Sequence, residues 1–256
     1  MSRRKKKTIP DGGAEPFCPH FEKCGGCTYQ RFDYEGQMKI KLDMVKETLN
    51  EAYQKALGSD NDSASENQFP LFECLESPDR TEYRNKMEFS FGDSEKDGPL
   101  SLGLHERGSF YNIVSILDCR IVDADYRAIL WAALQYFSEK GISYVHKKTH
   151  EGYLRHLVVR KSAATGEILI SLVTSSEIKD KELLDGFVDR LLLLELYGYV
   201  SGIIHIINDS LADVVKADSM ELLYGRDHIV EKLFGLSFKI TPFSFFQTNY
   251  KGAEVL

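Results

Sequence analysis

The chain has 256 residues, of which 43% are hydrophobic and 28% are charged, a composition typical of a globular protein. No run approaches the roughly eighteen apolar residues of a membrane-spanning helix, and no apolar stretch follows the basic start of the chain as it would in a secretory signal. The net charge of −7 argues against a general binder of polyanions. A surface for nucleic acid would therefore have to be a local patch.

The first part of the chain is predicted to hold a flexible basic arm and one long helix. Residues 1–15 are rich in charge, proline and glycine, and the arm itself is Arg3, Arg4, Lys5, Lys6 and Lys7. A helix is predicted over 33–57, with Asp33 as its cap, because apolar residues recur there every three or four positions. These residues are Met38, Leu42, Val45, Leu49 and Tyr53. A polar loop is expected over 58–68.

Strands are predicted from about Leu71 onward. Apolar and charged side chains alternate between Tyr83 and Gly92, so one face of that strand should be apolar. Asp97-Gly98 is a turn signal that predicts a hairpin into a second strand. Further strands are predicted at 100–104, 110–117, 154–160, 167–174, 200–208, 212–216, 221–223 and 236–241, and helices at 124–140 and 178–196. The fold class is therefore α/β (mixed α+β), with a β-rich central domain of antiparallel hairpins and flanking helices.

Three of the five cysteines lie close together, in the pattern Cys18-x5-Cys24-Gly-Gly-Cys27. An odd number of cysteines without an export signal indicates a reducing, cytoplasmic location, where disulfides are rare. With Cys119 they would supply four thiolates, which are ligands of both iron–sulfur clusters and structural zinc. We favour a [4Fe–4S] cluster. Zinc, with His20 or Cys119 completing the site, and free structural cysteines are the alternatives, because spacing alone does not select the metal.

Two details of the cysteine pattern support a metal site. Gly25 and Gly26 would let the backbone bend closely around the metal and direct N–H groups at sulfur. Cys74 lies between Phe72 and Leu75, and we interpret it as a buried hydrophobic residue that is not a ligand.

From Phe17 onward the sequence resembles the iron–sulfur RNA uracil-5-methyltransferases in six separate blocks. The blocks are CPHFEKCGGCTYQ (18–30), YRNKMEFSFG (83–92), LGLHERGSFYNIVSILDC (102–119), YLRHLVVR (153–160), YGRDHIVEKLFGLSF (224–238) and ITPFSFFQTN (240–249). Members of this family bind S-adenosylmethionine in a Rossmann-like domain. A cysteine adds to C6 of a flipped-out uracil, C5 takes the methyl group, and a glutamate helps to remove the C5 proton.

The resemblance implies a division of the chain into five parts. They are a basic lead-in (1–15), an iron–sulfur cluster loop (16–32), a helix that packs on the methyltransferase domain (33–58), a central β-rich RNA-contacting domain (70–241) and the beginning of the methyltransferase domain (242–256). The nucleophilic cysteine and the glutamate are expected beyond Leu256. The chain is thus expected to be a fragment that is inactive by itself and exposes the apolar stripe of its first helix.

The family's functional residues are carried over by position. Cys18, Cys24, Cys27 and Cys119 resemble the cluster ligands. Gln247 resembles the glutamine at the mouth of the cofactor and substrate pocket, and we expect it to be buried among phenylalanines. Phe245 resembles the aromatic residue that packs near the flipped base.

Basic residues on two predicted strands are candidates for contact with RNA phosphates. Arg84 and Lys86 stand on the polar face of an otherwise apolar strand. Arg155, His156 and Arg160 form a second basic stretch, expected at the surface.

The whole protein is expected to be a cytoplasmic monomer without a membrane partner that acts on structured RNA, with ribosomal RNA favoured over transfer RNA. The alternatives are a non-enzymatic iron–sulfur module that binds RNA and an iron–sulfur electron carrier or redox sensor.

Overall fold

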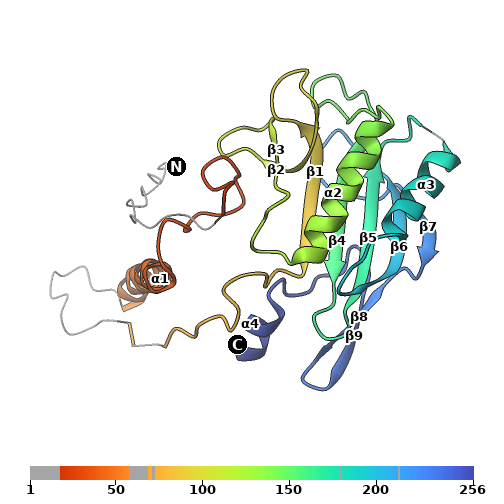
Figure 1. Cartoon of the computed structure of the whole chain (residues 1–256). Coiled ribbons are helices and arrows are strands. Elements are labelled where there is room, and N and C mark those ends of the chain that lie inside the picture. Colours follow the sequence, from red (N-terminus) through yellow and green to blue (C-terminus); the bar gives the residue numbers. More distant parts are fainter. Residues whose placement is uncertain (1–17, 58–68, 71–72, 179, 213) are drawn as a thin grey trace. The chain divides into compact units, whose positions relative to one another are not determined.

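The computed structural model describes residues 18–57, 69–70, 73–178, 180–212 and 214–256 (Figure 1). These residues divide into a smaller unit, residues 28–77, and a larger unit made of residues 18–27 and 78–256. The predicted basic arm (1–15) and polar loop (58–68) lie outside the described residues. In the described part of the chain, no helix combines the length and the apolar character that crossing a membrane requires.

The smaller unit is built on helix α1, Tyr34–Leu57, as the apolar periodicity predicts. The backbone N–H of Gly36 donates to Asp33 Oδ1 at 2.8 Å, which confirms Asp33 as the cap. The Tyr53 and Phe69 rings meet edge to face, with centroids 5.8 Å apart. None of the side chains at 34–56 is fully buried, so the expectation that this helix packs on a further domain stays a prediction.

Cys74 is exposed, which corrects the prediction of a buried residue. Residues 73–76 belong to no helix or strand, and all four are exposed. The apolar residues on either side of Cys74 therefore do not indicate a core position, because this segment is not covered by a packed layer.

The larger unit is built on a seven-stranded sheet with the strand order β3-β2-β1-β4-β5-β6-β7. The strands are β1 (Lys86–Asp93), β2 (Leu100–His105), β3 (Ile113–Ser115), β4 (Leu154–Lys161), β5 (Glu167–Thr174), β6 (Tyr199–Ile207) and β7 (Ser219–Gly225). All neighbours are antiparallel except β5 and β6, which are parallel. A parallel pair needs a crossover, and helix α3 (Lys181–Leu192) provides it. The structure thus confirms a mixed fold dominated by antiparallel strands.

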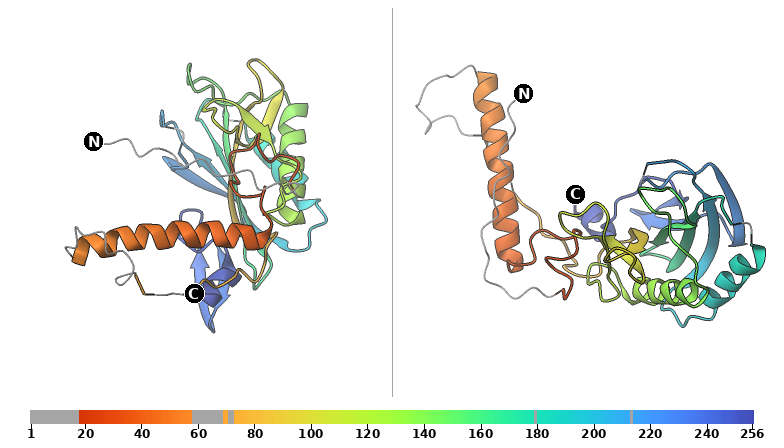
Figure 2. Two further views of the ribbon diagram at one scale, coloured as in Figure 1. Left: turned by 90° about the vertical axis from the view of Figure 1, so that its left-hand side faces the viewer. Right: turned by 90° about the horizontal axis from the view of Figure 1, so that it is seen from above.

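The two faces of the sheet are covered differently (Figure 2). Helices α2 (Ala124–Glu139) and α3 pack on one face, over a core that contains the fully buried Phe89, Phe137 and Phe187. On the other face, Ile229 and Ile240 of a two-stranded hairpin join a second cluster of buried residues. The hairpin is β8 (Ile229–Leu233) and β9 (Leu236–Ile240). Helix α4, Tyr250–Val255, follows it.

Residues 212–216 do not form the predicted strand, a statement that leaves out residue 213, which the structure does not describe. The carbonyl of Ala212 accepts a hydrogen bond from Arg155 Nη2 at 2.9 Å, and that of Val214 accepts one from Asn208 Nδ2 at 2.7 Å. Side chains therefore bind backbone groups that a strand would use in a ladder.

Candidate functional site

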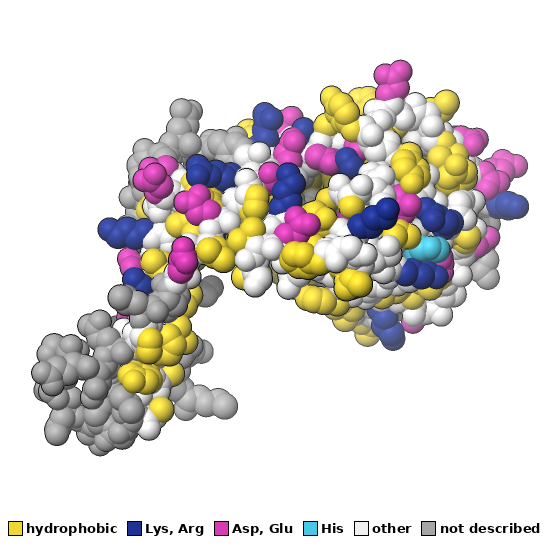
Figure 3. All heavy atoms as spheres, turned by 90° about the horizontal axis from the view of Figure 1, so that it is seen from below, with side chains coloured by type: hydrophobic (Ala, Val, Ile, Leu, Met, Phe, Trp, Pro, Cys, Tyr) yellow, Lys and Arg dark blue, Asp and Glu magenta, His cyan; other side chains and the backbone are white. Residues whose placement is uncertain are grey.

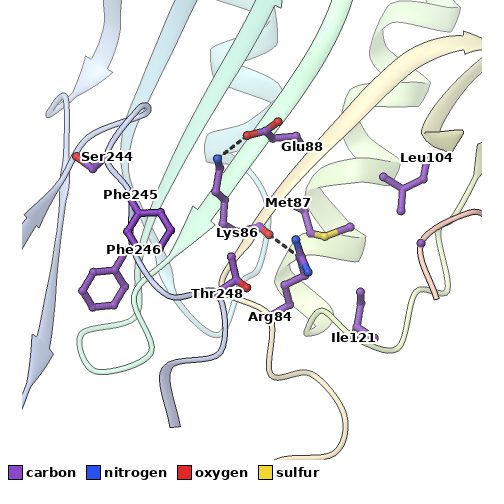
Figure 4. A pocket seen from close by; sticks show the side chains of 11 residues that line it. Arg84, Lys86, Met87, Glu88, Leu104, Ile121, Ser244, Phe245, Phe246 and Thr248 are labelled. Atoms are coloured by element: carbon purple, nitrogen blue, oxygen red, sulfur yellow. Dashed lines mark hydrogen bonds and ion pairs between the residues drawn. The ribbon is translucent and has the colours of Figure 1, made fainter. Parts of the chain in front are cut away.

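A cavity of about 390 Å³ lies beside the first residues of β1 (Figure 4). Strand β2 pairs with β1 only from Ser90 onward, so the edge of β1 before that point has no partner strand on this side. The cavity is lined by Gly26, Arg84, Lys86, Met87, Glu88, Leu104, Ile121, Ser244, Phe245, Phe246 and Thr248. It therefore brings together residues from four of the sequence blocks described above.

The buried Arg160 holds the loop between β9 and α4 in place at this cavity. Arg160 is 3% exposed, and its guanidinium donates to the carbonyl of Pro242 at 3.0 Å and to that of Ser244 at 2.6 Å. Burial lowers the pKa of Arg160, and the neighbouring Glu88 opposes this effect. The group remains a cation, which makes both hydrogen bonds charge-assisted.

Asn85 fixes the second half of the same loop. Its backbone N–H donates to the carbonyl of Thr248 at 2.9 Å, and its side-chain amide donates to the carbonyl of Gln247 at 3.1 Å. Held at both ends, the loop presents Phe245 with 88% of its surface exposed. A large apolar ring so exposed on an anchored loop is an unusual surface residue, and it lies at the edge of the cavity.

Gln247 is exposed, so the expectation of a glutamine buried among phenylalanines is wrong. The chain on either side of it is held through backbone carbonyls, and this turns the side chain outward. Its expected role at a cofactor stays a prediction.

Arg84 and Lys86 both line the cavity. Arg84 Nε donates to the carbonyl of Lys86 at 3.0 Å, and Lys86 Nζ forms an ion pair with Glu88. Glu88 therefore offsets part of the positive charge at this site. The two basic side chains are only partly buried, which leaves them within reach of a ligand.

Arg155 and His156 are buried, so the expectation of a basic surface stretch on β4 is wrong. Arg155 donates to the carbonyls of Asn208 and Ser210, each at 2.7 Å, and His156 Nδ1 lies 3.3 Å from Ser90 Oγ. Hydrogen bonds between buried polar groups of this kind stabilise the fold.

The cysteine loop is attached to the end of β2. Cys24 forms an isolated β-bridge with Glu106, and the N–H of Gly25 donates to the carbonyl of His105 at 2.8 Å. A Cβ atom on Gly26 would lie 2.8 Å from Leu104 Cδ1, so a side chain there would force a shift. The N–H of Gly26 donates to Cys24 Sγ at 3.3 Å, which is the N–H-to-sulfur contact that a thiolate ligand favours.

The four cysteines of the predicted metal site belong to the larger unit, and Cys18, Cys24 and Cys119 influence one another electrostatically. Burial raises the pKa of Cys24 and of Cys119, and the charge of Cys18 raises both further. Burial raises the pKa of Tyr83, and Cys27 and Cys119 add to that increase. Four cysteine thiols are the donor set of a thiolate-bound metal once they are deprotonated. However, the described residues contain no group of three or more histidine, cysteine or acidic side chains arranged to hold a metal ion.

The charged side chains are well mixed over the face of the larger unit that Figure 3 shows. Lys and Arg lie among Asp, Glu and hydrophobic side chains, in keeping with the net charge of −7. Contact with a polyanion would therefore depend on small groups of basic residues such as Arg84 and Lys86.

Curated proteins from several bacteria are similar to this chain. A protein of Clostridium tetani is 47% identical over 94% of the chain and 50% of its own length, and one of Caldanaerobacter subterraneus is 44% identical over 93% and 49%. A protein of Clostridium acetobutylicum is 44% identical over 96% of the chain and 51% of its own length. Each carries the name uncharacterized RNA methyltransferase. No family model matches the chain.

A solved structure shares the fold. It is the tRNA (uracil-54, C5)-methyltransferase of Pyrococcus abyssi in complex with S-adenosyl-L-homocysteine, with a TM-score of 0.64 and 26% sequence identity over 91% of this chain and 48% of that one. Over the length it covers, the chain is therefore similar to RNA methyltransferases, one of which is a uracil C5 enzyme. It spans about half the length of the curated relatives it matches.

The sequence indicates no role for Asn85, and it places Arg160 in a basic surface stretch, whereas the structure buries Arg160 as an anchor of the loop between β9 and α4. Both lie in blocks that carry the family resemblance, YLRHLVVR and YRNKMEFSFG. A basic residue within an apolar run was a signal available for Arg160, because a charge in such a run has to be hydrogen-bonded.

Proposed function

We propose that the protein containing this chain is an S-adenosylmethionine-dependent methyltransferase that acts on C5 of uridine in structured RNA. The observation that carries the proposal is the match of more than nine-tenths of the chain, in sequence and in structure, to RNA methyltransferases, one of them a uracil C5 enzyme. S-adenosylmethionine would supply the methyl group. Because the relatives are about twice as long, the proposal concerns the whole protein and assigns this chain the contact with RNA.

The cavity beside β1 supports this role for the chain. Its volume of about 390 Å³ is in the range of small-ligand sites. The exposed ring of Phe245 offers a flat apolar surface on which an unstacked base can lie. Arg84 and Lys86 would contact phosphate oxygens on either side of that base. Gln247, two residues beyond Phe245, would contact the cofactor or the edge of the base through its amide.

The proposal includes a [4Fe–4S] cluster held by Cys18, Cys24, Cys27 and Cys119. Support comes from the four cysteine thiols of the larger unit and from the Gly26 N–H directed at Cys24 Sγ. When bound, such a cluster would join the loop at 18–27 to the segment before α2. Its role would be structural, since methyl transfer to an activated uracil needs no electron.

The function can be tested with the full-length native protein. We would incubate it with S-adenosylmethionine and unmodified ribosomal or transfer RNA, digest the RNA, and identify the nucleosides by mass spectrometry. The expected product is 5-methyluridine in one of the two RNAs, and ribosomal RNA is our prediction. If neither RNA gains 5-methyluridine, the proposal is overturned. RNA binding without methylation would favour a non-enzymatic RNA-binding module.

The assay should be repeated with Phe245→Ala and a matched control. Phe245→Ala removes the ring at the cavity and should lower methylation at least tenfold if the ring holds the target base. Phe234→Ala removes another exposed ring, at the tip of the β8–β9 hairpin, and should leave methylation unchanged.

A further inference from the structure

Two exposed aromatic rings and two lysines form a compact surface of the larger unit. We call Phe110, Tyr111, Lys147 and Lys148 the aromatic–lysine patch. The rings are 63% and 53% exposed and meet edge to face, with centroids 5.7 Å apart. Lys147 Nζ lies 4.4 Å from the centre of the Phe110 ring, and Lys148 Nζ lies 5.1 Å from that of Tyr111. None of the four residues lines the cavity beside β1.

The two rings are carried by a well-braced loop between β2 and β3. The N–H of Glu106 donates to the carbonyl of Asn112 at 2.9 Å, and Asn112 Nδ2 donates to the Glu106 carboxylate at 2.7 Å. The N–H of Tyr111 donates to Ser109 Oγ at 3.2 Å. The backbone that carries the rings is therefore fixed by hydrogen bonds within the loop and loses little further freedom when a ligand binds.

The lysines come from a second loop, between α2 and β4, which is closed by its own hydrogen bonds. The N–H of Val145 donates to the carbonyl of Leu154 at 2.8 Å, and that of His146 to the carbonyl of Glu151 at 2.9 Å. Lys147 Nζ then donates to the carbonyl of Phe110 at 2.7 Å. The patch is thus assembled from two loops that this contact ties together.

The local charge at the patch contrasts with that of the chain. Its two loops carry Arg107, Lys140, Lys147 and Lys148 as bases and Glu106 and Glu151 as acids. In a chain with a net charge of −7, this is a locally basic surface. A polyanion is the ligand that such a surface favours.

The combination of rings and ammonium groups selects among ligands. A hydrophobic protein surface offers neither a negative charge nor an acceptor to the two ammonium groups, so it is an unfavourable partner for them. An unpaired nucleotide offers both a flat π face for a ring and a phosphate for a lysine. A base pair inside a duplex offers the phosphate but not the open face.

We propose that the aromatic–lysine patch is a second RNA-contacting surface, which binds unpaired nucleotides. Phe110 and Tyr111 stack on bases, while Lys147 and Lys148 contact the neighbouring phosphates. Strand β2 connects the two regions along the chain: Leu104 lines the cavity beside β1, and the ring of the next residue, His105, stacks on Phe110 with centroids 6.1 Å apart. This inference rests on the proposed function only in naming RNA as the nucleic acid.

Binding can be measured with the full-length protein and a fluorescently labelled oligouridylate of about twelve nucleotides, with an RNA duplex of the same length for comparison. The native protein should bind the single strand more tightly than the duplex. Phe110→Leu should weaken binding of the single strand about tenfold, because it keeps apolar bulk but removes the stacking face. Phe110→Trp should restore the affinity.

Lysine variants provide a second test that does not alter the rings. Replacing Lys147 and Lys148 together by glutamine should weaken binding of the single strand. It should also lower the slope of log affinity against log salt concentration by about the amount that two phosphate contacts contribute. The matched control is Lys96→Gln, whose side chain is 93% exposed and lies on another loop. Unchanged affinity of the Phe110→Leu protein for the single strand, or equal losses for single strand and duplex, would overturn the inference.

The methylation assay separates this inference from the proposed function. If the native protein methylates RNA but the patch variants bind the oligouridylate as tightly as the native protein does, the inference about the patch is overturned and the proposed function stands. If the patch variants bind the oligouridylate more weakly but the native protein forms no 5-methyluridine in any RNA, the inference about the patch is supported and the proposed function is overturned.

Discussion

Arg160 is almost completely buried, yet its contacts determine where an exposed residue lies. Its planar guanidinium reaches the carbonyls of both Pro242 and Ser244, and Phe245 follows immediately. At the scale of single residues, a buried charge thus positions the ring that we assign to the base.

We expect Arg160→Lys to destabilise the protein by about 2 kcal/mol, because one ammonium group cannot replace the two directed hydrogen bonds of the guanidinium. Urea unfolding followed by circular dichroism would measure the change. Arg120→Lys is the control, since Arg120 is exposed and its substitution should have little effect. An unchanged midpoint for Arg160→Lys would show that Arg160 does not anchor the loop.

Asp125 is a second buried charge with a structural role, and it predicts how stability depends on pH. Its carboxylate accepts from Lys161 Nζ at 2.6 Å and from the N–H groups of Tyr197 and Gly198, each at 2.8 Å. Burial by itself would raise the pKa of Asp125, but these hydrogen bonds outweigh burial, and the pKa is lowered below its usual value near 3.8.

A carboxyl group with a lowered pKa in the folded state stabilises the protein above its unfolded pKa. That contribution is lost as the pH falls through the folded value. We therefore expect the free energy of unfolding to drop below about pH 4, and Asp125→Asn to flatten that drop while costing about 2 kcal/mol at pH 7. Urea midpoints at pH 3, 5 and 7 would measure both effects. Equal pH profiles for the two proteins would contradict the assignment.

At the scale of elements, the β8–β9 hairpin is attached to the sheet by two carboxylates, one on the hairpin and one on the sheet. Glu231 of β8 is fully buried and accepts from Ser162 Oγ at 2.9 Å and from the N–H of Ala163 at 2.8 Å. Glu167 of β5 accepts from the N–H of Val230 at 2.6 Å. The hairpin leads directly into the loop that carries Phe245, so its attachment supports the site.

Removal of the Glu231 carboxylate should weaken this attachment. We expect Glu231→Ala to destabilise the protein by about 3 kcal/mol, because it leaves several donors of the turn at 162–164 without an acceptor. Lys232→Ala, on the exposed side of the same strand, should change stability by less than about 0.5 kcal/mol. Similar unfolding curves for both variants would show that the hairpin is held by its apolar contacts alone.

At the scale of the whole molecule, the metal content tests the assignment of the cysteines. The full-length protein purified without oxygen should contain iron and acid-labile sulfide. Cys119→Ser should lose most of the iron, because it removes one of four thiolates. Cys74→Ser is the control, since Cys74 is exposed and not assigned to the site. Stoichiometric zinc without iron would replace the cluster by a structural zinc site.

The periodic elements could be predicted from the sequence, because the side chains that define them also bury them. Helix α1 keeps its apolar period over its whole length, and β5 was predicted at its observed bounds. Strand β8 was missed, because Glu231 stands where an apolar residue would complete the alternation with Ile229 and Leu233. In a sequence, a buried carboxylate cannot be told from a surface carboxylate before its hydrogen-bond donors are known.

The sequence by itself determined the mixed fold class, the family resemblance, the cysteine pattern and the candidates Arg84, Lys86 and Phe245. Only the tertiary structure decided which charges are exposed. It buries Arg155, His156 and Arg160, places Gln247 at the surface and brings Phe110 and Tyr111 together with Lys147 and Lys148. The physical reason is that hydrophobic periodicity is a local property of the chain, whereas the partners that satisfy a buried charge or assemble a binding surface come from distant segments.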